Sequence, residues 1–164
     1  MRRVRERLEK EKARGLGHHA RQTASRNGGR NGGDRHAIDI KYSAGGMLDV
    51  YFATRYLQLR DDVPDEGENR STLATLERLE ASGSLETSDY EALSAGYELL
   101  RSVDHHLRLI AGKVAALPST DYPAYKEIAK RLGFDSPARL SETLRDRMLA
   151  IREAYDRITG MAQI

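Results

Sequence analysis

The 164-residue chain contains no cysteine, which excludes disulfide scaffolds, zinc sites built on thiolates and thiol nucleophiles. No run of apolar residues approaches the roughly 18 that a membrane-spanning helix needs. The first residues are charged and do not form the apolar stretch of a secretory signal. We therefore expect a cytoplasmic protein. Its length predicts a single domain that hides roughly 70% of the surface its unfolded chain exposes.

Charge is divided unevenly along the chain. Residues 1–36 hold 11 Lys and Arg against 4 Asp and Glu, a balance of +7, whereas residues 37–164 hold 16 against 21, a balance of −5. A basic segment of this kind is either a solvated flank or a tail that binds phosphate or nucleic acid. The sequence leaves both interpretations open.

The basic segment is predicted to contain a helix followed by a linker. Residues 1–14 are rich in Arg, Glu and Lys, and apart from Val4 and Leu8 they offer few apolar side chains to bury, so a helix here needs a partner surface. Residues 15–34 contain six glycines and almost no apolar residue. This composition is typical of a flexible linker or loop.

Residues 37–43 alternate apolar and polar side chains, which predicts a short strand. In a strand, Asp39 and Lys41 would share one face at a separation of about 7 Å. No second strand is predicted, and an isolated strand leaves its backbone groups unpaired. We therefore expect either a short hairpin that the pattern does not reveal or a missing piece of protein that pairs with the strand.

The rest of the chain predicts a mainly α fold, a helical bundle. The expected helices are Met47–Arg60, Ser71–Ala81, a long one from Ser88 to Gly112, one of about two turns from Pro123 to Leu132, and a last long one with Ser136 as N-cap and Pro137 as first residue. Ser88 followed by Glu91 fits a capping box. We divide the chain into the basic arm 1–36, a strand, turn and central helix over 37–60, and a helical bundle over 61–164.

The predicted helix over residues 47–60 carries apolar side chains on two faces. One face comprises Leu48, Phe52, Tyr56 and Leu59, and the other comprises Val50, Ala53 and Leu57. A helix with two apolar faces is typical of the centre of a core. We therefore expect this helix to lie centrally.

The segment between the strand and this helix concentrates residues that could bind phosphate. Gly45 and Gly46 let backbone amides approach a ligand, and an anion fits the amides at a helix N-terminus. Carboxylates beside it, such as Asp49 in the first helical turn, could hold a Mg²⁺ ion that bridges phosphate oxygens. The same residues also fit a structural interpretation, in which Asp39 and Lys41 form a solvated pair, the glycines form a turn and Asp49 favours the helix dipole.

The run Asp-Ile-Lys-Tyr-Ser-Ala-Gly-Gly-Met-Leu-Asp-Val-Tyr-Phe, residues 39–52, resembles a known signature. It is similar to the one that follows the nucleotidyltransferase core of glutamine synthetase adenylyltransferases, which are related to PII uridylyltransferases. The similarity extends over about residues 37–160 and includes Tyr97–Arg101 and Val103–Leu107. It implies the C-terminal helical portion of an enzyme that transfers AMP between ATP and a tyrosine of glutamine synthetase.

The resemblance also implies roles for single residues and names partners. The residues that match the signature are implied to bind the nucleotide: Asp39, Lys41, Gly45 and Gly46. Asp49 is implied to be catalytic and to hold metal. The implied cofactors are ATP and Mg²⁺. The implied partners are glutamine synthetase, a PII-type regulator and a nucleotidyltransferase domain that this chain lacks.

The chain departs from the family pattern at two places, and the second of them predicts that the chain alone is inactive. The family has Glu where this chain has Tyr51, so a carboxylate that the resemblance would place near Asp49 is absent. The Gly-Ser loop followed by Asp-x-Asp, which would hold two Mg²⁺ ions, is also absent. Gly83-Ser84 with Asp89 imitates its letters but follows a predicted helix.

Two alternative functions remain open from the residues alone. The chain could be a stand-alone helical module that binds a protein partner. Residues 123–145 also resemble a helix-turn-helix DNA reader, although acidic side chains in its second helix would repel phosphate. The histidines favour no metal site: His105 falls on a polar face and His106 at the core edge, while Asp104 and Arg108 are predicted to form an ion pair.

Overall fold

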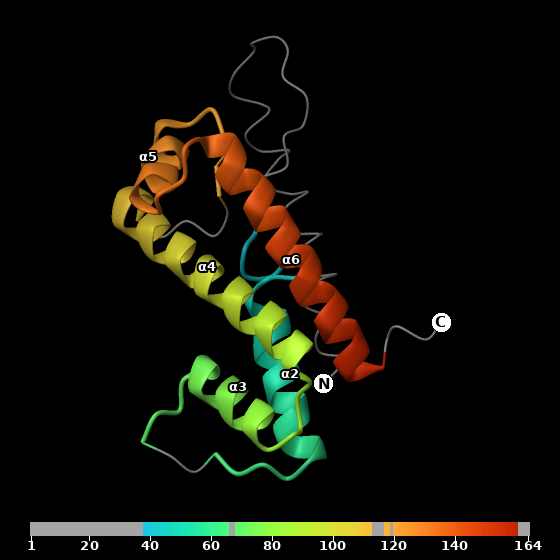
Figure 1. Ribbon diagram of the computed structural model, residues 1–164. Helices are drawn as coiled ribbons and strands as arrows, with labels where there is room; N and C mark the ends of the chain where they lie inside the picture. Colours follow the sequence, from blue (N-terminus) through green and yellow to red (C-terminus); the bar gives the residue numbers. More distant parts are fainter. Residues whose placement is uncertain (1–37, 66–67, 113–116, 119, 161–164) are drawn as a thin grey trace, which may run out of the picture.

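The computed structural model describes residues 38–65, 68–112, 117–118 and 120–160. These residues form five helices, namely α2 (Met47–Arg60), α3 (Thr72–Ala81), α4 (Thr87–Ala111), α5 (Pro123–Arg131) and α6 (Pro137–Thr159) (Figure 1). The prediction of a mainly α fold is therefore confirmed. The expected basic helix and glycine-rich linker lie outside the described residues and stay predictions.

The two longest helices, α4 and α6, pack against each other and form the centre of the bundle. Helix α2 packs against α3, α4 and α6, and α5 lies against the C-terminal half of α4 and the start of α6 (Figure 1). Fully buried leucine and isoleucine side chains from these helices fill the core, among them Leu57, Leu93, Leu100, Leu144 and Ile151. None of the described helices combines the length and the apolar character that a membrane crossing requires.

The predicted strand over residues 37–43 does not form in the described part of the chain. Residues 40–46 make turns, and the only strand-like pairing among the described residues is an isolated antiparallel bridge between Ile38 and Leu117. The Asp39 carboxylate accepts hydrogen bonds of 3.0 Å from the backbone amides of Lys41 and Tyr42. A side chain that bonds the amides two and three residues ahead offers the backbone an alternative to a strand ladder.

The helix limits agree with the sequence in most places. Helix α2 has the predicted bounds, Ser71 and Ser136 are N-caps whose side chains accept backbone hydrogen bonds, and α5 begins at Pro123. The predicted capping box at Ser88 and Glu91 is wrong, because α4 already begins at Thr87. Leu85 is buried in the core, and α4 begins two residues after it, with Glu86 as the N-cap.

This difference predicts unequal effects of two serine substitutions. Ser136→Ala removes a side-chain oxygen that accepts a 3.1 Å hydrogen bond from the Arg139 amide, and we expect it to lower the free energy of unfolding by about 1 kcal/mol. Ser88→Ala removes no cap and should change stability by less than about 0.5 kcal/mol. Urea denaturation of both variants measures the effects. Equal losses would contradict the observed start of α4.

Burial of Tyr125 predicts a loss of stability at high pH. Burial raises the pKa of the Tyr125 hydroxyl above its ordinary value, because the ionised phenolate is disfavoured inside the protein. A raised pKa means that the folded state holds its proton where the unfolded state releases it, so stability falls as the pH rises above about 10. Tyr125→Phe should lose less stability between pH 8 and pH 11 than the wild-type chain in denaturant titrations. An identical loss would exclude this residue as the cause.

Candidate functional site

The turn formed by residues 39–46, together with the first turn of α2, contains all five residues that the sequence predicts to be functional. Its backbone is held by local hydrogen bonds, including 3.0 Å bonds from the Met47 amide to the Ile40 carbonyl and from the Leu48 amide to the Lys41 carbonyl. We call residues 39–49 the signature turn. It lies between α4 and α6, and both helices contact its side chains or backbone.

On the α4 side, Lys41 of the signature turn forms an ion pair. Its Nζ atom lies 2.9 Å from Oδ1 of Asp104, while Nε of Arg108 lies 3.0 Å from Oδ2 of the same carboxylate. The predicted pair between Asp104 and Arg108 is thus confirmed, with Lys41 as an additional partner. Asp39 does not share a strand face with Lys41, because its carboxylate turns back to the local amides.

The two glycines of the signature turn approach protein backbone closely. Gly45 has a φ of +74°, and a Cβ atom built there would lie 1.8 Å from the Met148 carbonyl oxygen of α6. A Cβ atom at Gly46 would lie 2.8 Å from the carbonyl oxygens of Lys41 and Ser43. Both positions therefore exclude larger residues for reasons of packing.

Asp49 holds the turn from inside the protein. Its side chain has no exposed surface, its Oδ2 atom accepts a 2.6 Å hydrogen bond from the Gly45 amide, and the same oxygen lies 3.6 Å from a guanidinium nitrogen of Arg152 in α6. Arg152 also lies 3.0 Å from Asp156. A charge buried in this way needs its partners, because an isolated carboxylate inside a protein is very costly.

Tyr51, at the position where the resemblance expects Glu, lies on the exposed side of α2. Tyr51 is 45% exposed, and the guanidinium of Arg55 lies 5.6 Å from the centre of its ring. Two residues on from the enclosed Asp49, the side chain at this position lies on the outward side of α2. Glu at this position would face outward, away from the Asp49 carboxylate.

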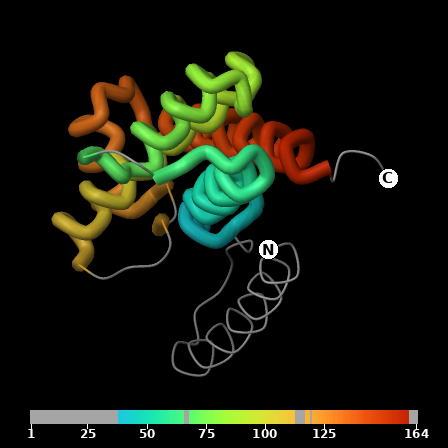
Figure 2. The backbone as a smooth tube through the Cα atoms, turned by 90° about the horizontal axis from the view of Figure 1, so that it is seen from below, coloured from blue at the N-terminus to red at the C-terminus, as the bar shows by residue number. Residues whose placement is uncertain are grey.

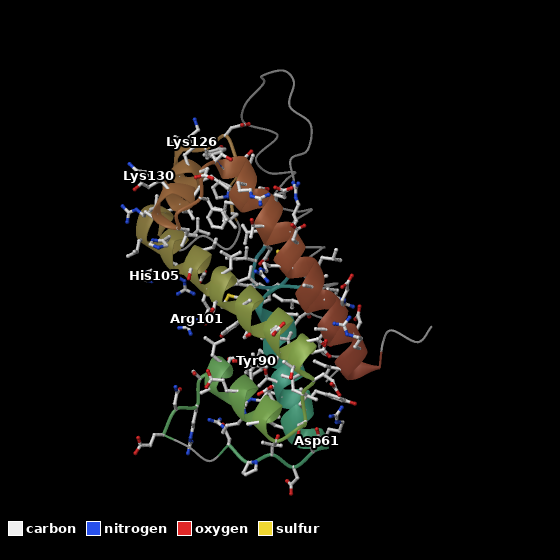
Figure 3. All side chains as sticks on the ribbon, viewed as in Figure 1. Asp61, Tyr90, Arg101, His105, Lys126 and Lys130 are labelled. Carbon is white, nitrogen blue, oxygen red and sulfur yellow. The ribbon has the colours of Figure 1, made fainter. Side chains whose placement is uncertain are left out.

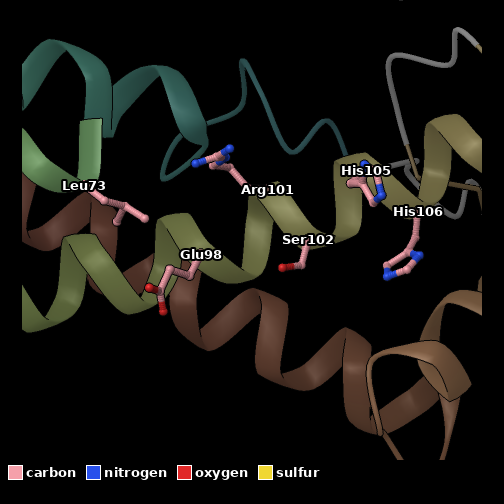
Figure 4. Close-up of a pocket in the computed structure, with 6 residues that line it drawn as sticks. All are labelled: Leu73, Glu98, Arg101, Ser102, His105 and His106. Atoms are coloured by element: carbon pink, nitrogen blue, oxygen red, sulfur yellow. The ribbon is translucent and has the colours of Figure 1, made fainter. Parts of the chain in front are cut away.

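Two surface hollows lie away from the signature turn. The larger, of about 480 Å³, is formed mainly by α4 and is lined by Leu73, Glu98, Arg101, Ser102, His105 and His106 (Figure 4). Arg101 and His105 point from the same side of α4 (Figure 3). The second hollow, of about 350 Å³, includes Arg60, Ser84, Asp89 and Arg157.

The second hollow contains Gly83, Ser84 and Asp89, the residues that imitate the Gly-Ser and Asp-x-Asp pattern. Asp89 accepts hydrogen bonds of 2.6 and 3.0 Å from the Arg157 guanidinium, and Gly83 and Ser84 lie in the turn between α3 and α4. This Asp is therefore used in a structural ion pair. No set of three or more His, Asp or Glu side chains in the described ranges is arranged to hold a metal ion.

Sequence reasoning missed the residues that hold the signature turn from other helices. Asp104 and Arg108 carry a helical ion-pair spacing, and Arg152 and Asp156 carry the same spacing four residues apart. These patterns indicate pairing along one helix only. The additional partners, Lys41 and Asp49, are distant in sequence and become visible only in the fold.

Comparisons with known proteins match nearly the whole chain to one family. The family model described as GlnD PII-uridylyltransferase matches residues 2–162. A bifunctional glutamine synthetase adenylyltransferase/adenylyl-removing enzyme from Neisseria meningitidis is 27% identical over 123 residues, which cover 74% of this chain and 14% of that enzyme. The enzyme of the same name from Pseudomonas aeruginosa is 33% identical over 108 residues, covering 65% of this chain and 11% of that enzyme. The chain thus spans only a small part of the length of these relatives.

Proposed function

We propose that this chain, which belongs to the GlnD PII-uridylyltransferase family, is the helical portion of an enzyme that transfers AMP between ATP and a tyrosine of glutamine synthetase. The observation that carries the choice of AMP and glutamine synthetase is the similarity to two relatives named glutamine synthetase adenylyltransferase/adenylyl-removing enzyme. The family match over residues 2–162 supports a nucleotidyltransferase-related region. The match includes the whole signature turn. The resemblance of residues 39–52 points to the same reaction.

The nucleotide and its metal are proposed to bind mainly to a nucleotidyltransferase domain outside this chain. The described residues do not fit a Mg²⁺ site by themselves, because Asp49 is fully enclosed and already bonded, and no cluster of ligands lies near it among those residues. Mg²⁺ prefers carboxylates together with water and substrate phosphates, and an enclosed carboxylate offers no room for them.

The signature turn is proposed to form the edge of the site that meets this domain. Lys41 is one quarter exposed, so its ammonium group is the member best able to reach a phosphate if its bond to Asp104 opens. Asp39, Gly45 and Gly46 would shape the backbone around it. The catalytic role expected of Asp49 becomes an indirect one, in which its carboxylate fixes the Gly45 amide.

Label transfer tests this function. The 164-residue chain, purified alone, is incubated with Mg²⁺, glutamine synthetase and a PII protein, with either α-labelled ATP or α-labelled UTP. We expect no labelled protein from the chain alone. Addition of a nucleotidyltransferase domain from an enzyme of this family should produce labelled glutamine synthetase from ATP only.

The other outcomes each overturn part of the proposal. Label on the PII protein from UTP would assign the chain to a uridylyltransferase. Label produced by the chain alone would contradict its expected inactivity. Tight binding of glutamine synthetase with no transfer under any condition would favour the stand-alone binding module.

DNA binding through residues 123–145 is not favoured by the geometry. The two expected helices are present, but Arg139 at the start of α6 donates a 2.6 Å hydrogen bond to Glu142 of the same helix. The negative charge of Glu142 beside this arginine weakens its attraction for a phosphate.

A further inference from the structure

Helix α4 carries a group of basic side chains beside the signature turn. Arg101, His105 and Arg108 follow one another at intervals of four and three residues, so they lie on one side of the helix, and all three are exposed. Lys41 of the signature turn reaches the same side, because its Nζ atom lies 2.9 Å from Asp104, which falls between Arg101 and Arg108 on the helix. We call Lys41, Arg101, His105 and Arg108 the basic cluster.

The basic cluster holds more positive than negative charge. The carboxylate within it, Asp104, lies 2.9 Å from Nζ of Lys41 and 3.0 Å from Nε of Arg108. Arg101 forms no ion pair with another described residue, and its guanidinium lies 5.8 Å from the centre of the Tyr97 ring. Lysine and the two arginines, set against one carboxylate, therefore leave an excess of positive charge even before the histidine is counted.

The nearby acidic residue Glu98 does not pair with this excess charge. Glu98 and Arg101 line the same surface hollow, but in Figure 4 their side chains point to opposite sides of α4. Residues 37–164 as a whole carry a net charge of −5. The positive excess beside the signature turn is therefore a local feature that the average charge of the helical body does not explain.

We propose that the basic cluster binds the polyphosphate chain of a nucleoside triphosphate. Arginine binds phosphate oxygens through paired hydrogen bonds, and lysine adds a point charge. Arg101 and Arg108 are seven residues apart, about 10 Å along the helix, so their cations match an extended anion with several charges better than a single carboxylate. Figure 2 shows the signature turn, drawn in blue, at the edge of the helical body, where a ligand can approach it. The inference rests on the proposed function, in which a domain outside this chain binds most of the nucleotide.

The shared carboxylate of Asp104 allows Lys41 to exchange partners at low cost. A nearly buried carboxylate that loses its last cation is strongly destabilised. Asp104 has two cations, so when Lys41 turns to a phosphate the bond from Arg108 remains. Arg101 has no ion pair to break. Asp104 is therefore a positioning residue that holds Lys41 in place until the phosphate competes for it.

Titration of the 164-residue chain with inorganic tripolyphosphate tests the basic cluster directly. Residues 1–36 are also basic, so the readout must resolve single sites, and the amide NMR signals of α4 and of the signature turn provide it. At low salt these signals should shift in a saturable manner, and Arg101→Gln should raise the Kd obtained from them about tenfold. Lys126→Gln is the matched control, because Lys126 is exposed and lies on α5, well separated from Arg101 (Figure 3). It should change this Kd by less than about twofold.

Removal of the competing carboxylate should have the opposite effect. Asp104→Asn frees Lys41 and should lower the Kd for tripolyphosphate by about threefold or more, a gain that a purely structural role of Asp104 would not produce. Glu98→Gln removes the same charge on the other side of α4 and should change the Kd by less than about twofold. Weaker binding by Asp104→Asn, in a variant whose NMR spectrum remains that of the folded chain, would overturn the proposal. A larger gain from Glu98→Gln than from Asp104→Asn would overturn it as well, because the anion would then lie in the hollow.

ATP and adenosine show which part of the nucleotide is recognised. ATP should shift the α4 signals with a Kd within about threefold of that of tripolyphosphate, and adenosine should shift none of them. Shifts caused by adenosine, or by ATP but not by tripolyphosphate, would assign the site to the nucleoside and overturn the proposal.

The NMR titration and the label-transfer assay fail independently. Tripolyphosphate shifts confined to residues 1–36 would overturn the basic cluster as a polyphosphate site and leave the proposed transfer of AMP intact. Shifts at α4 that respond to Arg101→Gln as expected, together with no labelled glutamine synthetase, would support the basic cluster and reject the proposed reaction.

Discussion

Replacing Gly45 by alanine is expected to lower the free energy of unfolding by about 3 kcal/mol, which corresponds to a decrease in Tm of roughly 6–12 °C for a chain of this size. Two costs add at this position. A φ of +74° costs a residue with a Cβ atom about 1–2 kcal/mol, and the new methyl group would lie 1.8 Å from the Met148 carbonyl oxygen unless α6 or the turn moves. Thermal denaturation followed by circular dichroism measures the loss.

Gly83→Ala is the matched control for this experiment. Gly83 has the same φ of +74°, but a Cβ atom there would meet nothing within 4 Å. The control therefore reports the backbone cost alone, about 1 kcal/mol, and the difference between the two variants measures the close approach of the signature turn to α6. Equal losses of unfolding free energy in the two variants would mean that the signature turn moves away from α6 without an energetic penalty.

Asp49→Ala is expected to destabilise the protein by about 3–5 kcal/mol, because it leaves the Gly45 amide and the Arg152 guanidinium without a carboxylate they share. Asp49→Asn retains an acceptor oxygen for the amide and should cost less. A residue that serves only as a metal ligand would behave differently. Its replacement would change stability by less than about 0.5 kcal/mol while removing activity.

A double-mutant cycle separates these roles for Asp49. Asp49→Asn and Arg152→Gln, made singly and together, should show a coupling of about 0.5–3 kcal/mol in urea denaturation if the two side chains act as one unit. Additive losses would show that the 3.6 Å separation carries no interaction. Asp104→Asn provides a comparison on the α4 side of the turn, where Lys41 is the partner.

Local patterns were sufficient to predict most of the helices. The apolar spacing of residues 47–60, the serine before α3 and the Ser136-Pro137 pair before α6 each contain their own signal within a few residues. The prediction failed at residues 37–43 because alternation of apolar and polar residues is shared by strands and by some turns. Here the Asp39 side chain favours the turn, because its carboxylate accepts hydrogen bonds from the Lys41 and Tyr42 amides. The spacing of apolar residues gives no sign of these bonds.

The sequence was sufficient to predict which segment forms the candidate site. It was not sufficient to predict which side chains of other helices contact that segment. Asp39, Lys41, Gly45, Gly46 and Asp49 do lie together, as their closeness in sequence requires. Their partners come from α4 and α6, which lie 60 to 100 residues further along the chain. Contacts of this separation depend on the completed bundle, and a single sequence contains no direct signal for them.

The attachment of the signature turn to two helices also has a mechanical consequence. Ile38 is the first described residue, and its carbonyl accepts a 3.0 Å hydrogen bond from the Leu117 amide. Within the next eleven residues, Lys41 ties the chain to α4 and Asp49 ties it to α6. These are the longest helices that the structure describes, so a displacement of residues 38–49 would strain contacts to both members of the central helix pair.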